Sequence, residues 1–293
     1  MTDGAAPLLE VERLSIAVPA GRRIDGASAG DLTLVSDVSY AIRPGERVAL
    51  VGESGSGKSL TARAILRLDP GLRLSGSIRW DGRELVGAPE PVLRRIRGDD
   101  ISMIFQDPMT ALNPVLTIGE QVAEPLTVRG VPKKEALARA AEMLDWLRVP
   151  RAKERLRSYP GEFSGGMRQR VVMAAALIGR PRLLIADEPT TALDVRVQEQ
   201  VLDLIVEQSS ELGLAVLFIT HDLSIVAGLA HQVIVMYRGE FVEKRDVDGL
   251  FASPRHPYTR GLIGSIPRLT SDPSVRLSTV DEYMARNGGA ADE

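Results

Sequence analysis

Apolar residues along this chain occur in short runs that alternate with longer stretches of helical periodicity. This alternation predicts an α/β fold whose core contains parallel strands. We expect strands over residues 8–18, 32–43, 47–51, 77–80, 101–105, 183–186 and 215–220, and a closing hairpin from residues 232–238 and 241–244. Helices are expected over residues 58–68, directly after the third strand, and over residues 195–212.

The segment between the two halves of this α/β pattern is helical. Residues 117–149 show helical periodicity, clearest over residues 133–147, which predicts an inserted helical subdomain at about residues 108–178. Residues 19–31 are rich in Gly, Ala and Arg without a period, so we expect a loop there. The chain is mixed from Asp246 and polar beyond Thr279, where disorder is expected.

Composition narrows the possible functions. The 293 residues include 36 Lys plus Arg and 39 Asp plus Glu, giving a net charge of −3, and no cysteine. Disulfides, thiolate metal sites, iron–sulfur ligation and cysteine nucleophiles are therefore excluded. The near-neutral charge gives no electrostatic reason to expect a dedicated nucleic-acid binder. The longest apolar run is shorter than the roughly 18 residues of a membrane span and the N-terminus is unlike a signal peptide, so we expect a soluble cytoplasmic protein.

A glycine-rich segment follows the short strand at residues 47–51. It fits the phosphate-loop pattern G-x-x-x-x-G-K-[ST] over Gly52, Glu53, Ser54, Gly55, Ser56, Gly57, Lys58 and Ser59. Glycines let the backbone curve so that N–H groups point at phosphate oxygens, and the next helix adds the positive end of its dipole. Lys58 would bind the β- and γ-phosphates and Ser59 would bind Mg²⁺. A glycine-rich surface turn is the alternative, but the flanking strand and helix favour the phosphate loop.

Two carboxylates end the apolar run at residues 183–186. Ligands gather at the carboxyl ends of buried parallel strands, so Asp187 is placed to hold Mg²⁺ and Glu188 to orient or deprotonate an attacking water. Adjacent acids at a strand end are more often solvated turn residues, but the phosphate loop favours the catalytic interpretation. His221 follows another apolar strand and could contact the γ-phosphate, although a structural histidine is the alternative.

A second helix start has the features of an anion site. Ser164, Gly165, Gly166 and Met167 combine a hydroxyl, free amides and a dipole end. Capping of the helix by Ser164 alone is the other possibility. Two phosphate-binding helix starts beside one carboxylate pair suggest that the second start completes the ATP site of a facing subunit.

These motifs, in this order, resemble those of ATP-binding cassette (ABC) ATPases. Gln106 after a strand, and Ala192, Leu193 and Asp194 after the carboxylates, complete the set. The resemblance covers roughly residues 8–268. It implies a P-loop nucleotide-binding domain with a RecA-like core, an antiparallel β subdomain and the inserted helical subdomain. We expect this domain at residues 1–268 and a partly disordered C-terminal tail at residues 269–293.

The resemblance also implies a role for each motif. Two such domains close head to tail over two ATP molecules, and the signature at residues 164–167 contacts the ATP of the facing subunit. The resemblance assigns catalytic roles to Glu188, His221, Lys58 and Gln106. It assigns Mg²⁺ binding to Ser59, Gln106 and Asp187, and it places the D-loop at residues 192–194. ATP contacts are implied for Gly52, Ser54, Gly55, Ser56, Gly57, Lys58, Ser59 and Leu60.

Three stretches narrow the resemblance to the oligopeptide and dipeptide importer ATPases: residues 103–114, residues 162–170, and the tail at 251–259 with 265–267. This resemblance implies ATP-driven peptide import at the cytoplasmic face of the membrane. Its implied partners are a second ATPase subunit, identical or different, two permease subunits and an extracytoplasmic solute-binding protein. Import of nickel or glutathione, and a soluble ABC ATPase outside transport, remain alternatives. A binding protein that reads ATP without hydrolysis is disfavoured by Glu188 and His221.

The chain departs from its relatives at three places. Met167 stands where the general signature has glutamine. The resemblance implies that this replacement is normal in the peptide-importer subgroup. The aromatic residue that stacks on adenine is expected near Val18, where there is none, so nucleotide affinity is lower or another side chain substitutes. The C-terminal cysteine cluster of many subgroup members is missing, so no iron–sulfur cluster is expected.

Overall fold

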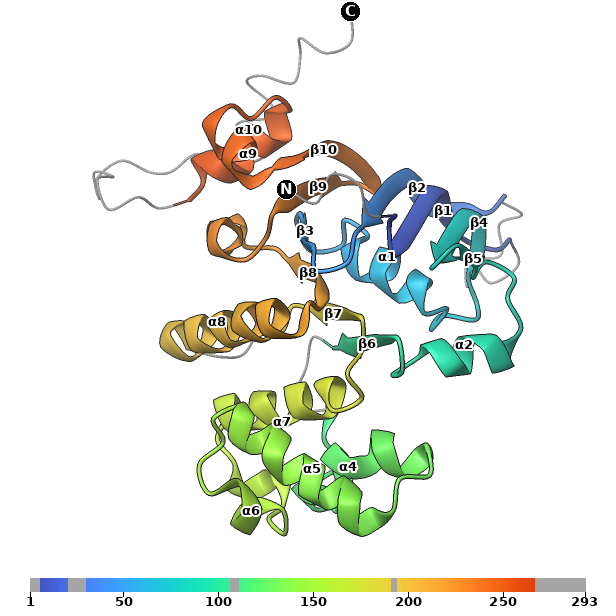
Figure 1. The fold of residues 1–293 in the computed structure, drawn as a ribbon. Coiled ribbons are helices and arrows are strands. Elements are labelled where there is room, and N and C mark those ends of the chain that lie inside the picture. Colours follow the sequence, from blue (N-terminus) through green and yellow to red (C-terminus); the bar gives the residue numbers. More distant parts are fainter. Residues whose placement is uncertain (1–5, 21–29, 106–110, 191–193, 267–293) are drawn as a thin grey trace, which may run out of the picture. The chain divides into compact units, whose positions relative to one another are not determined.

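The computed structural model describes residues 6–20, 30–105, 111–190 and 194–266 (Figure 1). The chain divides into two compact units. Among the described residues, the first comprises those within 43–45 and 88–217, and the second comprises those within 6–42, 46–87 and 218–266. Each unit contains some of the site residues predicted from the sequence.

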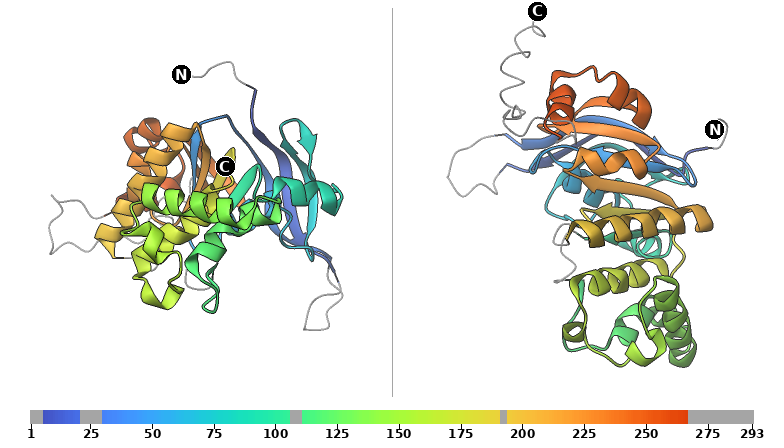
Figure 2. Two further views of the ribbon diagram at one scale, coloured as in Figure 1. Left: turned by 60° about the horizontal axis from the view of Figure 1, so that its bottom comes forward. Right: turned by 90° about the vertical axis from the view of Figure 1, so that its left-hand side faces the viewer.

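An antiparallel sheet occupies the N-terminal part of the second unit. Its strands are β1 (Leu9–Val18), β2 (Leu32–Ile42), β4 (Arg73–Trp80) and β5 (Arg83–Glu84), in the order β2-β1-β4-β5. Figure 2 shows these strands in blue and teal. The central strand β1 pairs at Leu9 with Ile42 on one side and with Trp80 on the other. These apolar side chains are buried, so one face of the sheet contributes to the core.

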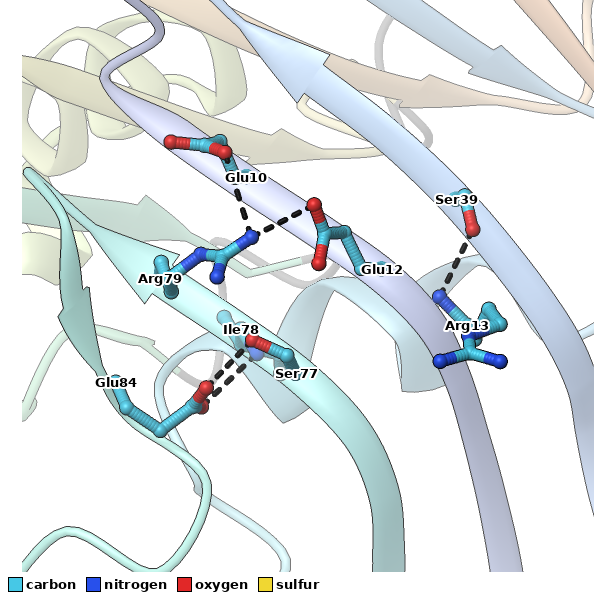
Figure 3. A network of polar contacts seen from close by, with 8 residues as sticks. All are labelled: Glu10, Glu12, Arg13, Ser39, Ser77, Ile78, Arg79 and Glu84. Atoms are coloured by element: carbon cyan, nitrogen blue, oxygen red, sulfur yellow. Dashed lines mark hydrogen bonds and ion pairs between the residues drawn. The ribbon is translucent and has the colours of Figure 1, made fainter.

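The polar residues of this sheet are paired across strands (Figure 3). The Arg79 guanidinium on β4 lies 2.6 Å from the Glu12 carboxylate and 3.6 Å from that of Glu10, both on β1. The Glu84 carboxylate accepts hydrogen bonds from the Ser77 hydroxyl and, at 3.0 Å, from the Ile78 N–H. Burial raises the pKa of Glu84, but these hydrogen bonds, together with those from the backbone of Val86 and Leu85, outweigh burial and leave the pKa below its usual value. Cross-strand pairs of this kind support the register of the sheet.

A second sheet has the strand order β10-β9-β3-β8-β7-β6. Within the second unit, β3 (Arg47–Val51) pairs in parallel with β9 (Gln232–Tyr237), and β9 pairs antiparallel with β10 (Glu240–Asp246). The helices of this unit are α1 (Lys58–Ile65), the 3-10 helix η2 (Leu223–Gly228), α9 (Val247–Ala252) and α10 (Pro257–Gly264). Strand β3 leads directly into the glycine-rich segment, so the phosphate loop starts from a buried strand.

The first unit contains strands β6 (Ile101–Ile104) and β7 (Leu183–Asp187), which are parallel neighbours. Strand β8 (Ala215–Thr220) begins in this unit and ends in the second. Its helices are α2 (Glu90–Ile96), α4 (Ile118–Val128), α5 (Lys133–Trp146), α6 (Ala152–Arg155), the 3-10 helix η1 (Pro160–Glu162), α7 (Gly165–Leu177) and α8 (Val195–Leu212). Helices α4, α5 and α7 pack against one another, as Figure 1 shows in green and yellow.

The local signals that begin the helices of this unit are conventional. Helix α4 starts with a capping box: the Thr117 hydroxyl accepts the N–H of Glu120, whose carboxylate accepts the N–H of Thr117. Helix α8 ends at Gly213, which has the left-handed conformation that suits glycine. Among the helices within the described residues, none is long and apolar enough to cross a membrane.

Most predicted elements are confirmed, including residues 47–51, 195–212 and 215–220 at their predicted bounds. The predicted helix at 58–68 is too long, because Arg67 has a φ of +52° and the helix has already ended at Ile65. The predicted strand at 77–80 is too short, because β4 pairs with β1 from Arg73 onward. Helices α2, α9 and α10 were not predicted. Most of the predicted loop at 19–31 lies outside the described residues.

Candidate nucleotide-binding and hydrolysis site

The phosphate loop of the second unit connects β3 to α1. Gly55 and Gly57 have φ values of +81° and +106°, a backbone conformation that other residues rarely adopt, so the loop depends on glycine at both positions. The Lys58 ammonium donates hydrogen bonds to the carbonyl oxygens of Gly52 at 2.8 Å and Glu53 at 2.7 Å. The side chain therefore folds back over the loop from the first residue of α1, with Ser59 and Leu60 next to it on the first turn.

The Ser56 side chain fits a phosphate ligand. It is 6% exposed, and its hydroxyl has no hydrogen-bond partner within the described part of the chain. A buried hydroxyl without a partner is costly, and a phosphate oxygen would supply the missing hydrogen bond. This observation supports the nucleotide contact predicted for Ser56.

The phosphate loop packs closely on strand β9. A Cβ atom on Gly52 would lie 2.1 Å from the carbonyl oxygen of Met236, and one on Gly57 would lie 2.8 Å from the Met236 Cε. The Gly239 N–H donates to the Ser56 carbonyl at 3.0 Å. Gly52 is thus required by close packing on a neighbouring strand, a reason that the motif pattern does not reveal.

His221 lies directly after β8 and is exposed, as expected for a residue at a strand's carboxyl end. Its neighbour Asp222 caps η2 by accepting the Ser224 N–H at 2.8 Å. The chain after His221 is therefore fixed, and the predicted contact of His221 with a γ-phosphate stays a prediction.

The carboxylate pair belongs to the first unit. Asp187 is the last residue of β7 and is 3% exposed, and Glu188 follows it at 9% exposed. Glu188 has a φ of +46°, the left-handed conformation that is uncommon for residues other than glycine. Such strain costs of order 1 to 3 kcal/mol and concentrates at functional sites. The interpretation of these acids as solvated turn residues disagrees with their burial.

The signature helix α7 begins as predicted. Ser164 caps the helix, and its hydroxyl accepts the N–H of Met167 at 3.4 Å. Ser164 and Gly165 are exposed, so the helix start faces solvent. The capping that was the alternative interpretation is thus present, and the predicted role of residues 164–167 as an anion site stays a prediction.

Gly166 packs tightly against the start of α8. A Cβ atom on Gly166 would lie 2.5 Å from the Cγ1 of Val197. The position of Val197 is set by the cap of α8, where the Asp194 carboxylate accepts the Val197 N–H at 3.0 Å. The second glycine of the signature therefore allows close approach of two helices.

We expect Gly166→Ala to destabilise the chain by about 1 to 3 kcal/mol, because the added methyl group overpacks this contact. Val197→Ala in the same chain should restore most of the lost stability, since it removes the atom that clashes. Chemical denaturation of the two single variants and the double variant measures the coupling. Additive effects of the two substitutions would contradict the contact.

The predicted site residues thus fall into two groups. The phosphate loop and His221 belong to the second unit, whereas Asp187, Glu188, the signature and Asp194 belong to the first. Gln106, Ala192 and Leu193 lie outside the described residues. Sequence reasoning missed Met236, which packs beneath the loop, and Tyr258, whose hydroxyl accepts the Glu53 N–H at 2.9 Å. The stretch at residues 251–259 contains Tyr258, but its sequence does not indicate a contact with the phosphate loop.

Known proteins resemble most of this chain. The family model described as "ABC transporter" matches residues 35–191, and the model described as "Oligopeptide/dipeptide transporter, C-terminal region" matches residues 242–287. The oligopeptide transport ATP-binding protein OppD of Salmonella typhimurium is 49% identical over 85% of this chain and 75% of its own length. OppD of Escherichia coli is 48% identical over 85% of this chain and 74% of its own length.

A solved structure is similar as well. The dimeric ATP-binding cassette MJ0796, in a post-hydrolysis state bound to ADP and Pi, matches with a TM-score of 0.70 and 28% sequence identity. The match covers 82% of this chain and 98% of that one. The expected cassette fold, with its antiparallel sheet, parallel strands and helices, is therefore confirmed.

Proposed function

This chain belongs to the ABC transporter family and is an ATPase of that family, and on this premise we propose that it powers the import of oligopeptides or dipeptides. The match of residues 242–287 to the oligopeptide/dipeptide transporter C-terminal region carries the proposal. That match lies after residues 35–191, which the ABC transporter model matches, so it adds information about the substrate class to what the shared ATPase motifs give. It disfavours the import of nickel or glutathione, and it disfavours a function outside transport.

In the proposed mechanism the phosphate loop binds ATP through its N–H groups and through Lys58, which releases its loop carbonyls to contact the phosphates. Ser59, Asp187 and Gln106 would hold Mg²⁺, since hydroxyl, carboxylate and amide oxygens are the donors that this ion prefers. Bound Mg²⁺ offsets the negative charge of the phosphates. The partnerless Ser56 hydroxyl supports the phosphate contact.

Glu188 is the proposed general base. Its carboxylate would accept a proton from the attacking water, while His221 hydrogen-bonds the γ-phosphate and Lys58 offsets its charge. The burial of Glu188 directly after Asp187 supports this role, because ligands gather at the carboxyl ends of buried parallel strands.

We further propose that two cassettes, identical or different, close head to tail over two ATP molecules. Residues 164–167 of one chain would then contact the ATP of the other, with the D-loop at 192–194 between the sites, and hydrolysis would reopen the dimer. The exposed start of α7 supports this arrangement. Two permease subunits would hold the dimer at the cytoplasmic face of the membrane, and an extracytoplasmic binding protein would deliver the solute. No role for nucleic acid is proposed. We retain residues 1–268 as the cassette, with its helical subdomain at about 108–178, and residues 269–293 as the tail.

Solute uptake tests the substrate class. Cells that lack this subunit should lose uptake of labelled di- and oligopeptides, and keep uptake of nickel and glutathione. Complementation with the intact chain should restore peptide uptake, whereas the Lys58→Ala variant should not. Unchanged peptide uptake in the deletion strain would refute the proposal, and loss of nickel or glutathione uptake would favour the corresponding alternative.

The absence of an aromatic residue near Val18 gives a separate prediction. Val18 is half-buried at the end of β1, next to its partner Leu32. We expect Val18→Tyr to tighten ATP binding by about 1 kcal/mol, because an aromatic ring can stack on adenine. Titration with ATP and with an inorganic triphosphate separates the contribution of the adenine base from that of the phosphates. Only ATP should bind more tightly. Unchanged ATP affinity would mean that another residue already contacts the base.

A further inference from the structure

The side chain of Tyr258 connects the segment after β10 to the phosphate loop. Its ring is fully buried, and its hydroxyl accepts the backbone N–H of Glu53 at 2.9 Å, across 205 positions of sequence. The ring packs on that of Tyr237 from β9, with 4.3 Å between centroids and an interplanar angle of 35°. All of these residues belong to the second unit.

The Glu53 backbone is held on both sides. Its N–H is bound by Tyr258, while its carbonyl oxygen accepts the Lys58 ammonium at 2.7 Å and the Ser56 N–H at 3.2 Å. Glu53 itself is exposed, so its own side-chain packing does not fix this part of the loop. If Lys58 turns to phosphate, the hydrogen bond that the Glu53 N–H donates to Tyr258 remains as an anchor at the start of the loop.

Tyr258 is placed by a short segment whose N–H groups are satisfied. His256 caps α10, with its Nδ1 accepting the Tyr258 N–H at 3.2 Å, and Pro257 occupies the first helical position. The Glu243 carboxylate on β10 is 8% exposed and accepts the N–H groups of Arg255 and His256, each at 2.9 Å. Strand β10 therefore fixes the start of the helix that carries the tyrosine.

The carbonyl groups of the same segment are satisfied too. The Arg245 guanidinium donates to the Ser253 carbonyl at 2.6 Å. The Arg260 guanidinium donates to the carbonyls of Pro254 at 3.0 Å and Arg255 at 2.9 Å. A segment with its backbone groups bound in this way has little freedom, so it can hold the phosphate loop in place.

The charge states of this segment are suited to a permanent contact. Burial raises the pKa of Tyr258 to about 12, so its hydroxyl stays protonated near neutral pH. Burial also raises the pKa of Glu243, but the N–H groups of His256 and Arg255, with the Thr259 side chain and the charge of Arg245, outweigh it and leave this pKa below its usual value. Glu243 therefore remains ionised and keeps its hydrogen bonds.

We propose that Tyr258 is a positioning residue of the ATP site, and that the segment from Glu243 to Tyr258 orders the phosphate loop before nucleotide binds. The inference rests on the ATP binding that the proposed function requires. Phosphate recognition by N–H groups is strongest when those groups are oriented in advance, because binding then loses less conformational entropy. The segment after the cassette core is, in this view, a part of the nucleotide site.

Two conservative substitutions in the full-length chain test the proposal. Tyr258→Phe keeps the buried ring and removes the acceptor for the Glu53 N–H. Tyr237→Phe removes a hydroxyl from the other ring of the same pair and serves as the control. We expect Tyr258→Phe to weaken ATP binding about three- to ten-fold, the effect of one lost hydrogen bond. Tyr237→Phe should stay within about two-fold of wild type.

Two further measurements separate positioning from stability. Amide exchange at Glu53 without nucleotide should become at least about ten-fold faster in Tyr258→Phe, because local opening is easier. The melting temperature without nucleotide should be similar in both variants.

Several results would overturn the proposal: equal ATP affinity of Tyr258→Phe and wild type, an equal loss in both tyrosine variants, or a loss of affinity matched by a fall in melting temperature specific to Tyr258→Phe. A wild-type chain that does not bind ATP would overturn the proposed function itself, and this inference with it. ATP binding by wild type with no difference between variants overturns the inference alone.

Discussion

Replacing Glu188 by glutamine is expected to lower ATP turnover of the assembled transporter by about 10²- to 10⁴-fold, the contribution of a general base. Glutamine has nearly the same shape as glutamate but cannot accept the proton of the attacking water at neutral pH. ATP binding should persist, because phosphate recognition is assigned to the phosphate loop and not to this carboxylate. The variant should therefore accumulate in the ATP-bound, closed dimer, which size-exclusion chromatography with ATP detects. Phosphate release measures the loss of turnover.

Glu199→Gln is the matched control, since Glu199 is an exposed glutamate on α8. It should leave both turnover and ATP-dependent dimerisation unchanged. Unaltered phosphate release in Glu188→Gln would remove Glu188 as the base. Loss of ATP-dependent dimerisation along with turnover would instead indicate that the strained residue supports the fold of the site.

Replacing Gly52 by alanine is expected to lower the free energy of unfolding by more than about 3 kcal/mol. The new Cβ atom would lie 2.1 Å from the Met236 carbonyl oxygen, which is backbone and belongs to the strand paired with β3. Neither atom can turn away, so β3 and β9 must separate or the loop must move. Denaturant unfolding of the nucleotide-free chain measures the loss.

Gly264→Ala is the control for this substitution. Gly264 ends α10, and a Cβ atom there would have no neighbour within 4 Å, so alanine should be neutral or slightly stabilising. Equal stability of Gly52→Ala and wild type would contradict the close packing of the loop on β9. Loss of ATP binding without loss of stability would assign Gly52 to phosphate recognition alone.

Sequence periodicity predicted the fold well where the local signals were strong. The helix at 195–212 begins with the capping residue Asp194 and ends at Gly213, so both ends are encoded by neighbouring residues. The start of β4 at Arg73 was missed because its first residues pair with β1 but are mostly exposed. An exposed edge of this kind has no apolar alternation from which a strand can be predicted.

The candidate site divides in the same way. The phosphate loop, the carboxylates and the signature are short motifs, and their chemistry follows from residue type and spacing within a few positions. The positive φ of Glu188 and the partnerless Ser56 hydroxyl could not be predicted, because they depend on packing against distant segments. The relation of the C-terminal segment to the site was likewise unforeseen.

By itself, the sequence determined that this protein is an α/β nucleotide-binding ATPase with a phosphate loop at 52–59, a carboxylate pair and a signature, because each of these motifs acts through groups that are neighbours along the chain. Only the tertiary structure decided which distant residues hold those motifs. Met236 packs closely on Gly52, and Val197 packs closely on Gly166. The Tyr258 hydroxyl accepts the Glu53 N–H. Such contacts arise from strand pairing and helix packing between segments far apart in sequence, so no local pattern encodes them.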